Sequence, residues 1–302
     1  MSDRRRITGP VNTFAPNIPS YNDNTSSSTA PSSSSSSSSS SNQVPQFFLK
    51  HGLIANSNGS AYLEINETTI IQVSVFGPRP IRGSFIDKAS VSVETKFLPH
   101  VSQPQSDIFN DTSNTNPTSS GGRDTSSASG YRTGMTPIEH KYSSYLETCL
   151  LPSILLSKYP KSTIDLQVSI ITTDARCNGL SGMLWLMQWI VVVSSLAIID
   201  AGIEIRDVVT SGVVKLTSSG QVLIGQDLDD KQGKGDGSDG GVYALVSFMN
   251  MKNDEIVGCW FEGGVNDEGM TELQMEKMID ECCKMSKLIR ANFNSYLLKS
   301  FN

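Results

Sequence analysis

The sequence predicts an α+β fold in which mixed sheets pack with helices, and three features of one central stretch predict it. Apolar and polar residues alternate over Ile164–Ile170, which is the pattern of a strand with one buried face. The Gly-rich segment Asn178–Gly182 then leads into a long apolar helix, for which Gly202 is a suitable C-cap. A second strand is expected directly afterwards, over Ile203–Thr210. Because the helix is apolar nearly all round, other layers must cover it on both sides.

The same helix raises the alternative of a membrane span. Met183–Ile199 carries no charge and is close to the shortest length that crosses a bilayer. However, Gln188 and Ser194 interrupt the run, Asp200 and Glu204 follow it, and neither end carries a basic cluster that would set orientation. The length and the flanking residues therefore favour a buried core helix.

The chain before the central stretch predicts an antiparallel meander. Extended runs start at Phe47 and continue over Ala61–Ile65 and Thr69–Phe76, with Asn58-Gly59 as a tight-turn signal between them. The segment Gly77–Phe85, GPRPIRGSF, is expected to form a rigid turn because two prolines and two glycines fix it. A further strand then follows at Val91, Val93 and Thr95.

Helix and hairpin signals account for most of the remaining sequence. Thr136, Pro137 and Glu139 have the positions of an N-cap, a first helical residue and a capping-box partner, which predicts a helix that stops near Pro152. Strands over 242–249 and 255–261 predict a hairpin. A final helix is expected over about 267–298. Its core stripe consists of Met278, Cys282, Met285, Ile289, Phe293 and Tyr296.

Two polar tracts set the expected domain organisation. Residues 1–45 form a tail that contains serines without interruption from 32 to 41, and residues 103–136 form a second tract rich in Ser, Thr, Asn and Gly. Neither has enough apolar surface to offset the entropy lost on ordering. We therefore expect a disordered tail at 1–45 and a single domain at 46–302, with a disordered insertion at 103–136 and an acidic Gly-rich loop at 226–241.

Composition excludes several function classes. The net charge of −6 argues against a free-standing nucleic-acid binder of the basic type. The five cysteines have no zinc spacing and are expected to be small buried residues in a reducing compartment. No signal-peptide pattern, Walker loop, GxSxG or HExxH motif is present, so an intracellular protein without a metal or cofactor is expected.

Four motifs follow one another along the chain: NGSAYLEIN at 58–66, VSVFGPRPIRGSF at 73–85, SKYPKSTIDLQV at 157–168 and LAIIDAGIEIRDVV at 196–209. In this order they resemble the RNase PH family, and in particular the RNase PH-like ring subunits of the eukaryotic RNA exosome. The resemblance covers about Arg4–Pro10 and then Phe47–Asn302 apart from the polar insertions. It implies an RNase PH-like fold with a βαβ core of the ribosomal S5 domain 2 type.

Active members of that family use inorganic phosphate to shorten RNA, and the resemblance implies where their site would lie. A Gly-Thr-Arg or Gly-Ser-Arg loop enters the central helix, but here the sequence is DARCNGLSG, so Arg176, Asn178, Gly179 and Ser181 are at most a remnant of a phosphate loop. A pair of aspartates should precede the late hairpin. Asp230 and Asp236 have the right spacing but lie too early, and Asp239 has Gly233 in its partner's place. We therefore expect no catalytic residues.

The resemblance implies a structural role in a hexameric ring of RNase PH-like proteins, capped by OB-type and KH-type proteins and threaded by single-stranded RNA. Arg79, Arg82, Lys158 and Lys161 are the basic residues of the resembling motifs and are candidate phosphate contacts. An inter-subunit salt bridge or a solvated charge is an equally good interpretation of each. An active phosphate-dependent 3′–5′ exoribonuclease, including one that trims tRNA 3′ ends, is the alternative function. A nuclear and nucleolar location, with some protein in the cytoplasm, is expected.

Overall fold

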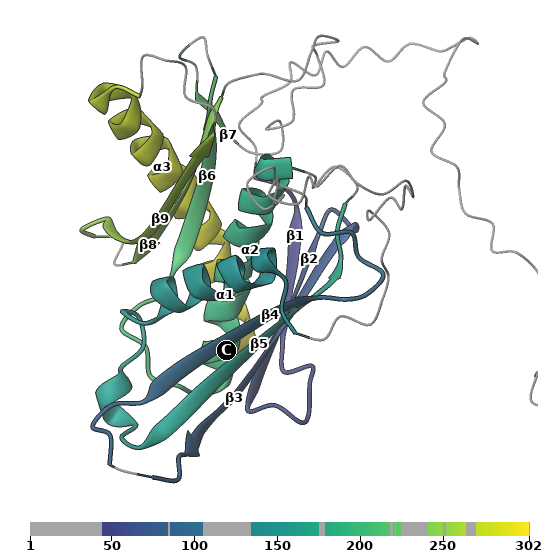
Figure 1. Cartoon of the computed structure of the whole chain (residues 1–302), viewed down its shortest axis with the longest axis vertical. Helices are drawn as coiled ribbons and strands as arrows, with labels where there is room; N and C mark the ends of the chain where they lie inside the picture. Colours follow the sequence, from purple (N-terminus) through teal and green to yellow (C-terminus); the bar gives the residue numbers. More distant parts are fainter. Residues whose placement is uncertain are drawn as a thin grey trace, which may run out of the picture. The chain divides into compact units, whose positions relative to one another are not determined.

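Two β-sheets and three α-helices make up the described part of the chain in a computed structural model (Figure 1). The structure describes residues 44–83, 85–104, 134–174, 179–217, 220, 222–224, 241–249, 252–263 and 270–301. The first sheet has the order β1-β2-β3-β5-β4 and the second has the order β7-β6-β8-β9. This arrangement is the expected α+β fold.

The first sheet contains the expected meander and the expected central strand. Its strands are β1 (Phe47–His51), β2 (Gly59–Ile65), β3 (Thr69–Pro80), β4 (Ser90–Phe97) and β5 (Ser162–Thr172). β1, β2 and β3 pair antiparallel in sequence order, whereas β4 pairs parallel with β5. Parallel neighbours need a crossover, and helix α1 (Pro137–Leu150) provides it. The βαβ unit of this sheet is therefore β4-α1-β5.

Helix α1 begins with the capping box that the sequence predicts. The Thr136 hydroxyl accepts a hydrogen bond from the Glu139 main-chain N–H, and the Glu139 carboxylate accepts one from the Thr136 N–H. The same carboxylate, which is only 2 % exposed, also accepts hydrogen bonds from the Phe97 N–H at 3.0 Å and from the Gln103 amide at 3.1 Å. Glu139 therefore fixes the start of α1 to the end of β4.

The central helix α2 (Gly179–Asp200) is a core helix, as its flanks predict. It lies between the two sheets, in contact with β1, β2, β3 and β5 on one side and with β6 and β8 on the other. Its length and its mean hydropathy of 2.0 fit a membrane span, but 94% of its apolar 18-residue stretch is buried inside the protein. Gly202 has a φ of 68° and ends the helix in the left-handed conformation that favours glycine.

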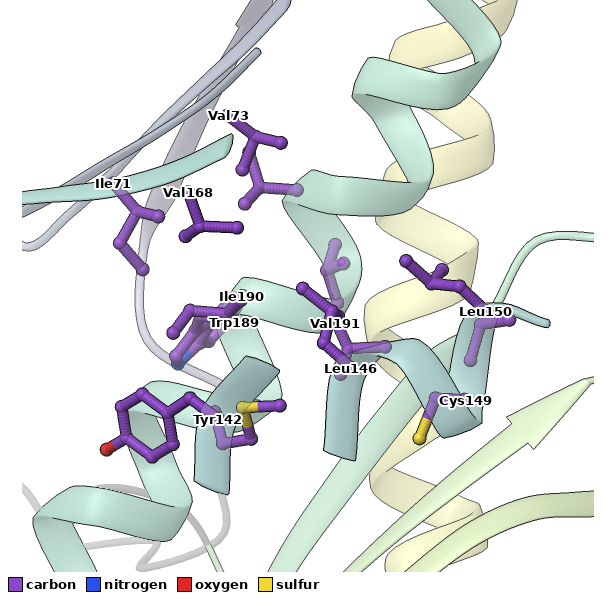
Figure 2. Packing of buried hydrophobic residues seen from close by; sticks show 14 of the residues in the cluster. Ile71, Val73, Tyr142, Leu146, Cys149, Leu150, Val168, Trp189, Ile190 and Val191 are labelled. Atoms are coloured by element: carbon purple, nitrogen blue, oxygen red, sulfur yellow. The ribbon is translucent and has the colours of Figure 1, made fainter. Parts of the chain in front are cut away.

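Apolar side chains of α1 and of β3 and β5 in the first sheet meet those of α2 around the middle of that helix (Figure 2). Figure 2 shows Trp189, Ile190 and Val191 of α2 between side chains of the first sheet and of α1. All the labelled residues of this cluster are almost completely buried: Ile71, Val73, Tyr142, Leu146, Cys149, Leu150, Val168, Trp189, Ile190 and Val191. The Tyr142 hydroxyl remains satisfied because it donates a hydrogen bond to the Met183 carbonyl at 2.9 Å. The α1–α2–sheet contact is thus the main core.

The prediction of a strand over Ile203–Thr210 is wrong. The strand after α2 is β6 (Thr210–Leu216), and it belongs to the second sheet. Residues 203–209 instead cross from one sheet to the other, with a single bridge between Ile205 and Ile154. The Leu155 N–H donates to the Glu204 carbonyl, and the Arg206 N–H donates to the Ser153 carbonyl. These local partners replace a strand ladder.

Replacing Arg290 with alanine is expected to destabilise this crossing by about 2 kcal/mol. Arg290 lies on the last helix with only 13% of its side chain exposed, where it pairs with Asp207 and donates to the Val208 carbonyl at 2.6 Å. Arg290→Lys should recover only part of the loss, because a lysine cannot keep both contacts in the same geometry. Urea unfolding of both variants measures the difference; an alanine variant as stable as the native chain would contradict this role.

The second sheet and helix α3 (Glu272–Phe301) form the other half of the fold. The sheet consists of β6, β7 (Val222–Ile224), β8 (Val242–Met249) and β9 (Glu255–Gly263). β8 and β9 form the expected hairpin, whereas β7 was not predicted. α3 packs on the sheet face opposite α2, and its predicted stripe is buried except for the half-buried Tyr296. Gly212 allows close contact here, because a Cβ on it would lie 2.2 Å from the Cys282 carbonyl oxygen.

Two predicted turns have a different structure. Asn58-Gly59 does not form a two-residue turn: Gly59 is the first residue of β2, and the Asn58 side chain accepts a hydrogen bond from the Gly77 N–H at 3.0 Å. The first residues of GPRPIRGSF are not a turn either, because Gly77–Pro80 continue β3 through an irregular register next to β5. The chain turns only after Pro80.

The cysteines mostly behave as small buried residues, as predicted. Cys149, Cys282 and Cys283 are buried, and burial raises the pKa of the Cys149 thiol to about 11. Burial also raises the pKa of Cys282 well above its ordinary value. Cys259 differs because it is exposed on β9, and Cys177 lies outside the described residues. A thiol with a raised pKa holds little thiolate at neutral pH, so Cys149 and Cys282 fit a structural role.

Candidate nucleic-acid interface

One end of the first sheet brings together three of the four predicted basic residues. Arg79 is near the end of β3, Arg82 follows in the connection to β4, and Lys161 directly precedes β5. This end lies at the lower edge of the sheet in Figure 1, where β3, β4 and β5 come together. The fourth residue, Lys158, lies in the short helix 156–158, which comes just before Lys161 and the start of β5.

Main-chain hydrogen bonds hold the two connections of this sheet end against each other. The Ile81 N–H donates to the Lys161 carbonyl at 3.0 Å, and the Lys161 N–H donates to the Ile86 carbonyl at 2.9 Å. Lys161 has a φ of 55°, a left-handed conformation that is uncommon for a residue with a side chain. The segments 81–83 and 85–86 are therefore connected to the segment 156–163, and we call these three segments the basic end.

Arg79 and Lys158 are held by carboxylates of the same chain. Arg79 forms an ion pair with Asp165 on β5, and its guanidinium lies 5.6 Å from the centre of the Phe76 ring. Lys158 forms an ion pair with Glu204, with both side chains about half exposed at 51%. Exposed pairs of this kind contribute little to stability. These two residues are thus partly neutralised in the free chain.

Arg82 and Lys161 are exposed at the basic end, and neither side chain has a partner among the residues described. Sequence reasoning missed three neighbours in the same connection. Lys88 is exposed, Phe85 is 69% exposed and Ile86 is 45% exposed. Exposed aromatic and basic side chains together are typical of surfaces that bind single-stranded nucleic acid. The sequence does contain a signal for this surface, because Phe85 is the last residue of the GPRPIRGSF motif that carries Arg79 and Arg82.

The predicted remnant of a phosphate loop lies far from the basic end. β5 begins at the basic end and runs for 11 residues toward α2, so at about 3.3 Å per residue the two regions are separated by roughly 33 Å along the strand. Gly179 and Ser181 are part of the first turn of α2, not of a loop, and Ser181 is buried. Arg176 and Asn178 lie outside the described residues. The structure therefore does not combine the two predicted groups into one site.

Metal-ligating side chains do not cluster in the part of the chain that the structure describes. No group of three or more His, Cys, Asp or Glu side chains in those residues could hold a metal ion. Two of the three histidines have structural partners: His51 bonds the Tyr296 hydroxyl at 2.8 Å, and His100 bonds the Ile171 carbonyl at 2.8 Å. Asp230, Asp236 and Asp239 lie outside the described residues.

Comparison with known proteins agrees with the fold and with the quoted motifs. The family model of the RNase PH 3′ exoribonuclease family, domain 1, matches residues 43–204. This chain therefore belongs to the 3′ exoribonuclease (RNase PH) family, as the motifs predict.

Among curated proteins, the chain is similar to exosome components. It is 27% identical over 283 residues to the exosome complex component MTR3 of Chaetomium thermophilum, which covers 87% of this chain and 87% of that protein. It is 28% identical to mtr3 of Schizosaccharomyces pombe, over 71% of this chain and 67% of that one. It is also 28% identical to the exosome complex component Rrp41 of Pyrobaculum aerophilum, over 69% of this chain and 71% of that one. The motifs resemble the fungal ring subunit also called the mRNA-transport regulator, and two of these three relatives are fungal.

Solved structures show the same fold. Rice Rrp46 has a TM-score of 0.61 and 18% identity, with 85% of this chain and 97% of that chain covered. A subunit of the Archaeoglobus fulgidus exosome, solved with RNA bound to the active site, has a TM-score of 0.57 and 13% identity. The match covers 84% of this chain and 90% of that chain. At these identities the likeness establishes the RNase PH-like fold.

Proposed function

We propose that this chain is a non-catalytic structural subunit of the ring of an RNA exosome, where it supports 3′–5′ RNA processing and degradation, including rRNA maturation and RNA turnover. The observation that carries the proposal is the alignment to an exosome component over 87% of both chains. An alignment of that extent leaves little of either protein for a different architecture. The ring neighbours are other RNase PH-like subunits, OB-type and KH-type proteins form the cap, and the complex works in the nucleus and nucleolus and also in the cytoplasm.

The absence of catalysis in this proposal rests on the sequence. Phosphorolysis needs cationic groups around the phosphate and a pair of carboxylates that support a metal ion. DARCNGLSG departs from the Gly-Thr-Arg loop of active members, and no aspartate pair meets both the spacing and the position. We infer that the chain contributes surface rather than chemistry.

The isolated recombinant chain provides the test of this inference. It should leave single-stranded RNA intact both with and without inorganic phosphate. Shortening of the RNA from its 3′ end only when phosphate is added would establish the alternative, an active exoribonuclease. A chain with Arg176→Ala then serves as the matched control, because a working phosphate loop would lose activity with that change.

In this proposal, the basic end contacts the RNA that passes through the ring. Arg82 and Lys161 are exposed there without a partner among the residues described, so the variant with Arg82→Ala and Lys161→Ala should weaken binding of single-stranded RNA by the purified complex. The slope of the logarithm of RNA affinity against the logarithm of salt concentration should become shallower by about 0.7 for each lost phosphate contact. Fluorescence anisotropy at several salt concentrations measures both effects.

The control for this prediction is Lys252→Ala, which removes an exposed charge from the turn between β8 and β9. RNA affinity and salt dependence should not change in that variant. Equal effects of the control and of the double variant would show that the basic end has no particular role in RNA binding.

A further inference from the structure

Strand β1 leaves one side of its main chain unpaired within the described residues. It pairs only with β2, in an antiparallel register that places Phe48 opposite Glu64 and His51 opposite Ala61. The Asn66 N–H donates to the Gln46 carbonyl, and the Gly52 N–H donates to the Ser60 carbonyl. Since hydrogen-bonded pairs alternate along an antiparallel ladder, Phe47 and Leu49 direct their N–H and C=O groups away from β2. An open edge of this kind is a template for another strand.

A groove runs along this open edge. It has a volume of about 560 Å³ and is lined by Val44–Leu49 on one side and by Asn292 and Tyr296 of α3 on the other. Toward His51 the groove is closed, because the His51 ring bonds the Tyr296 and Ser300 hydroxyls. The accessible edge is therefore short, with room for a strand of about three or four residues at 3.3 Å each.

A second depression continues from the groove over the outer face of the sheet. Its volume is about 650 Å³, and Phe48, which is 57% exposed, is shared by both. Glu64 and Glu67 line the second depression together with Gln46 and Asn66. Glu67 has no partner among the residues described, while Glu64 accepts a hydrogen bond from the Tyr62 hydroxyl at 3.2 Å. An apolar ring on the edge strand and two carboxylates thus line one depression that adjoins the open edge.

We propose that the β1 edge docks a short extended segment of another protein, in which an apolar residue alternates with lysine or arginine. The main chain of that segment pairs with Phe47 and Leu49, which is strand addition to a sheet edge. Its apolar side chain covers Phe48, and its cation meets Glu64 and Glu67. Charge also sets the direction in which the segment runs. Its cation must lie toward Glu64 and Glu67 and away from Lys50, which is farther along β1 and opposite Tyr62. The inference goes beyond the proposed function and does not require the chain to work in a ring.

A photo-cross-linker placed at the edge tests this surface in the full-length chain. p-Benzoylphenylalanine replaces Phe48 in tagged protein expressed in its own cells, and the cross-linked peptides are identified by mass spectrometry. The expected product joins residue 48 to an extended segment of a second protein that carries lysine or arginine within two residues of an apolar side chain. The same probe at Leu288, which is exposed on α3, should not give that product.

Neutralising the two carboxylates tests the charge part of the proposal. The variant with Glu64→Gln and Glu67→Gln should reduce the yield of the cross-link at least fivefold, with an unchanged melting temperature. Glu276→Gln, an exposed position on α3, is the matched control and should leave the yield unchanged. Cross-links to residues 1–43 of the same chain, to RNA or to no protein would overturn the proposal. A yield that does not respond to Glu64 and Glu67 would overturn it as well.

Discussion

Replacing Gly59 with alanine is expected to lower the free energy of unfolding by about 3 kcal/mol. A Cβ at this position would lie 2.2 Å from the Ala201 nitrogen and 2.5 Å from the Ala197 carbonyl oxygen. Both are main-chain atoms at the end of α2, so they cannot move aside as a flexible side chain would. The variant must separate the start of β2 from the end of the core helix. Equilibrium urea unfolding of the full chain, followed by circular dichroism, measures the loss.

The neighbouring contacts make this prediction specific. The Ser60 N–H donates to the Asp200 carboxylate at 2.8 Å, so any separation of β2 from α2 also breaks that bond. Lys50→Ala, on the adjacent strand and exposed, should change the stability by less than about 0.5 kcal/mol. Ala201→Gly should not rescue Gly59→Ala, because the contacts involve main-chain atoms. If Gly59→Ala unfolds at the same urea concentration as the native chain, the close approach of β2 to α2 is wrong.

Replacing Glu139 with alanine is expected to cost about 3 kcal/mol of stability as well. The change removes the acceptor for the Phe97 and Thr136 N–H groups and for the Gln103 amide. Water cannot replace it easily, because Glu139 is only 2% exposed. A buried donor left without a partner costs about 1–3 kcal/mol, and a lost N-terminal cap costs about 1 kcal/mol. Urea unfolding again measures the effect.

Two variants separate the hydrogen bonds of Glu139 from its position in the helix. Glu139→Gln keeps one carbonyl oxygen of similar shape and should retain more than half of the stability that the alanine variant loses. His140→Ala changes the next residue of α1, which is exposed, and should be nearly neutral. A loss in Glu139→Ala no larger than in His140→Ala would show that this carboxylate does not connect α1 to β4.

Most of the fold could be predicted because its elements have clear periodicity or clear caps. The alternation over Ile164–Ile170, the capping box at Thr136 and the stripe on α3 each specify an element from local sequence alone. The errors occur where tertiary contacts decide. Residues 203–209 have the composition of a strand, but they must cross between two sheets. Gly59 resembles a turn residue, although its small size serves the contact with α2.

The candidate site was predictable in composition but not in arrangement. The basic residues are visible in the sequence, and Phe85 stands beside them in one motif. The ion pairs of Arg79 with Asp165 and of Lys158 with Glu204 join residues distant in sequence, so no local pattern indicates them. Likewise, only the direction of β5 shows that Gly179 and Ser181 are remote from the basic end. The open edge of β1 also depends on the strand order of the sheet.

Native mass spectrometry of the tagged full-length chain, purified from its own cells, is the most direct test of the structural role. We predict a complex in which this chain is present once, together with a stoichiometric set of RNase PH-like subunits and RNA-binding cap proteins. A chain that is recovered alone or only as copies of itself, and that shortens RNA when phosphate is added, would contradict the proposed function.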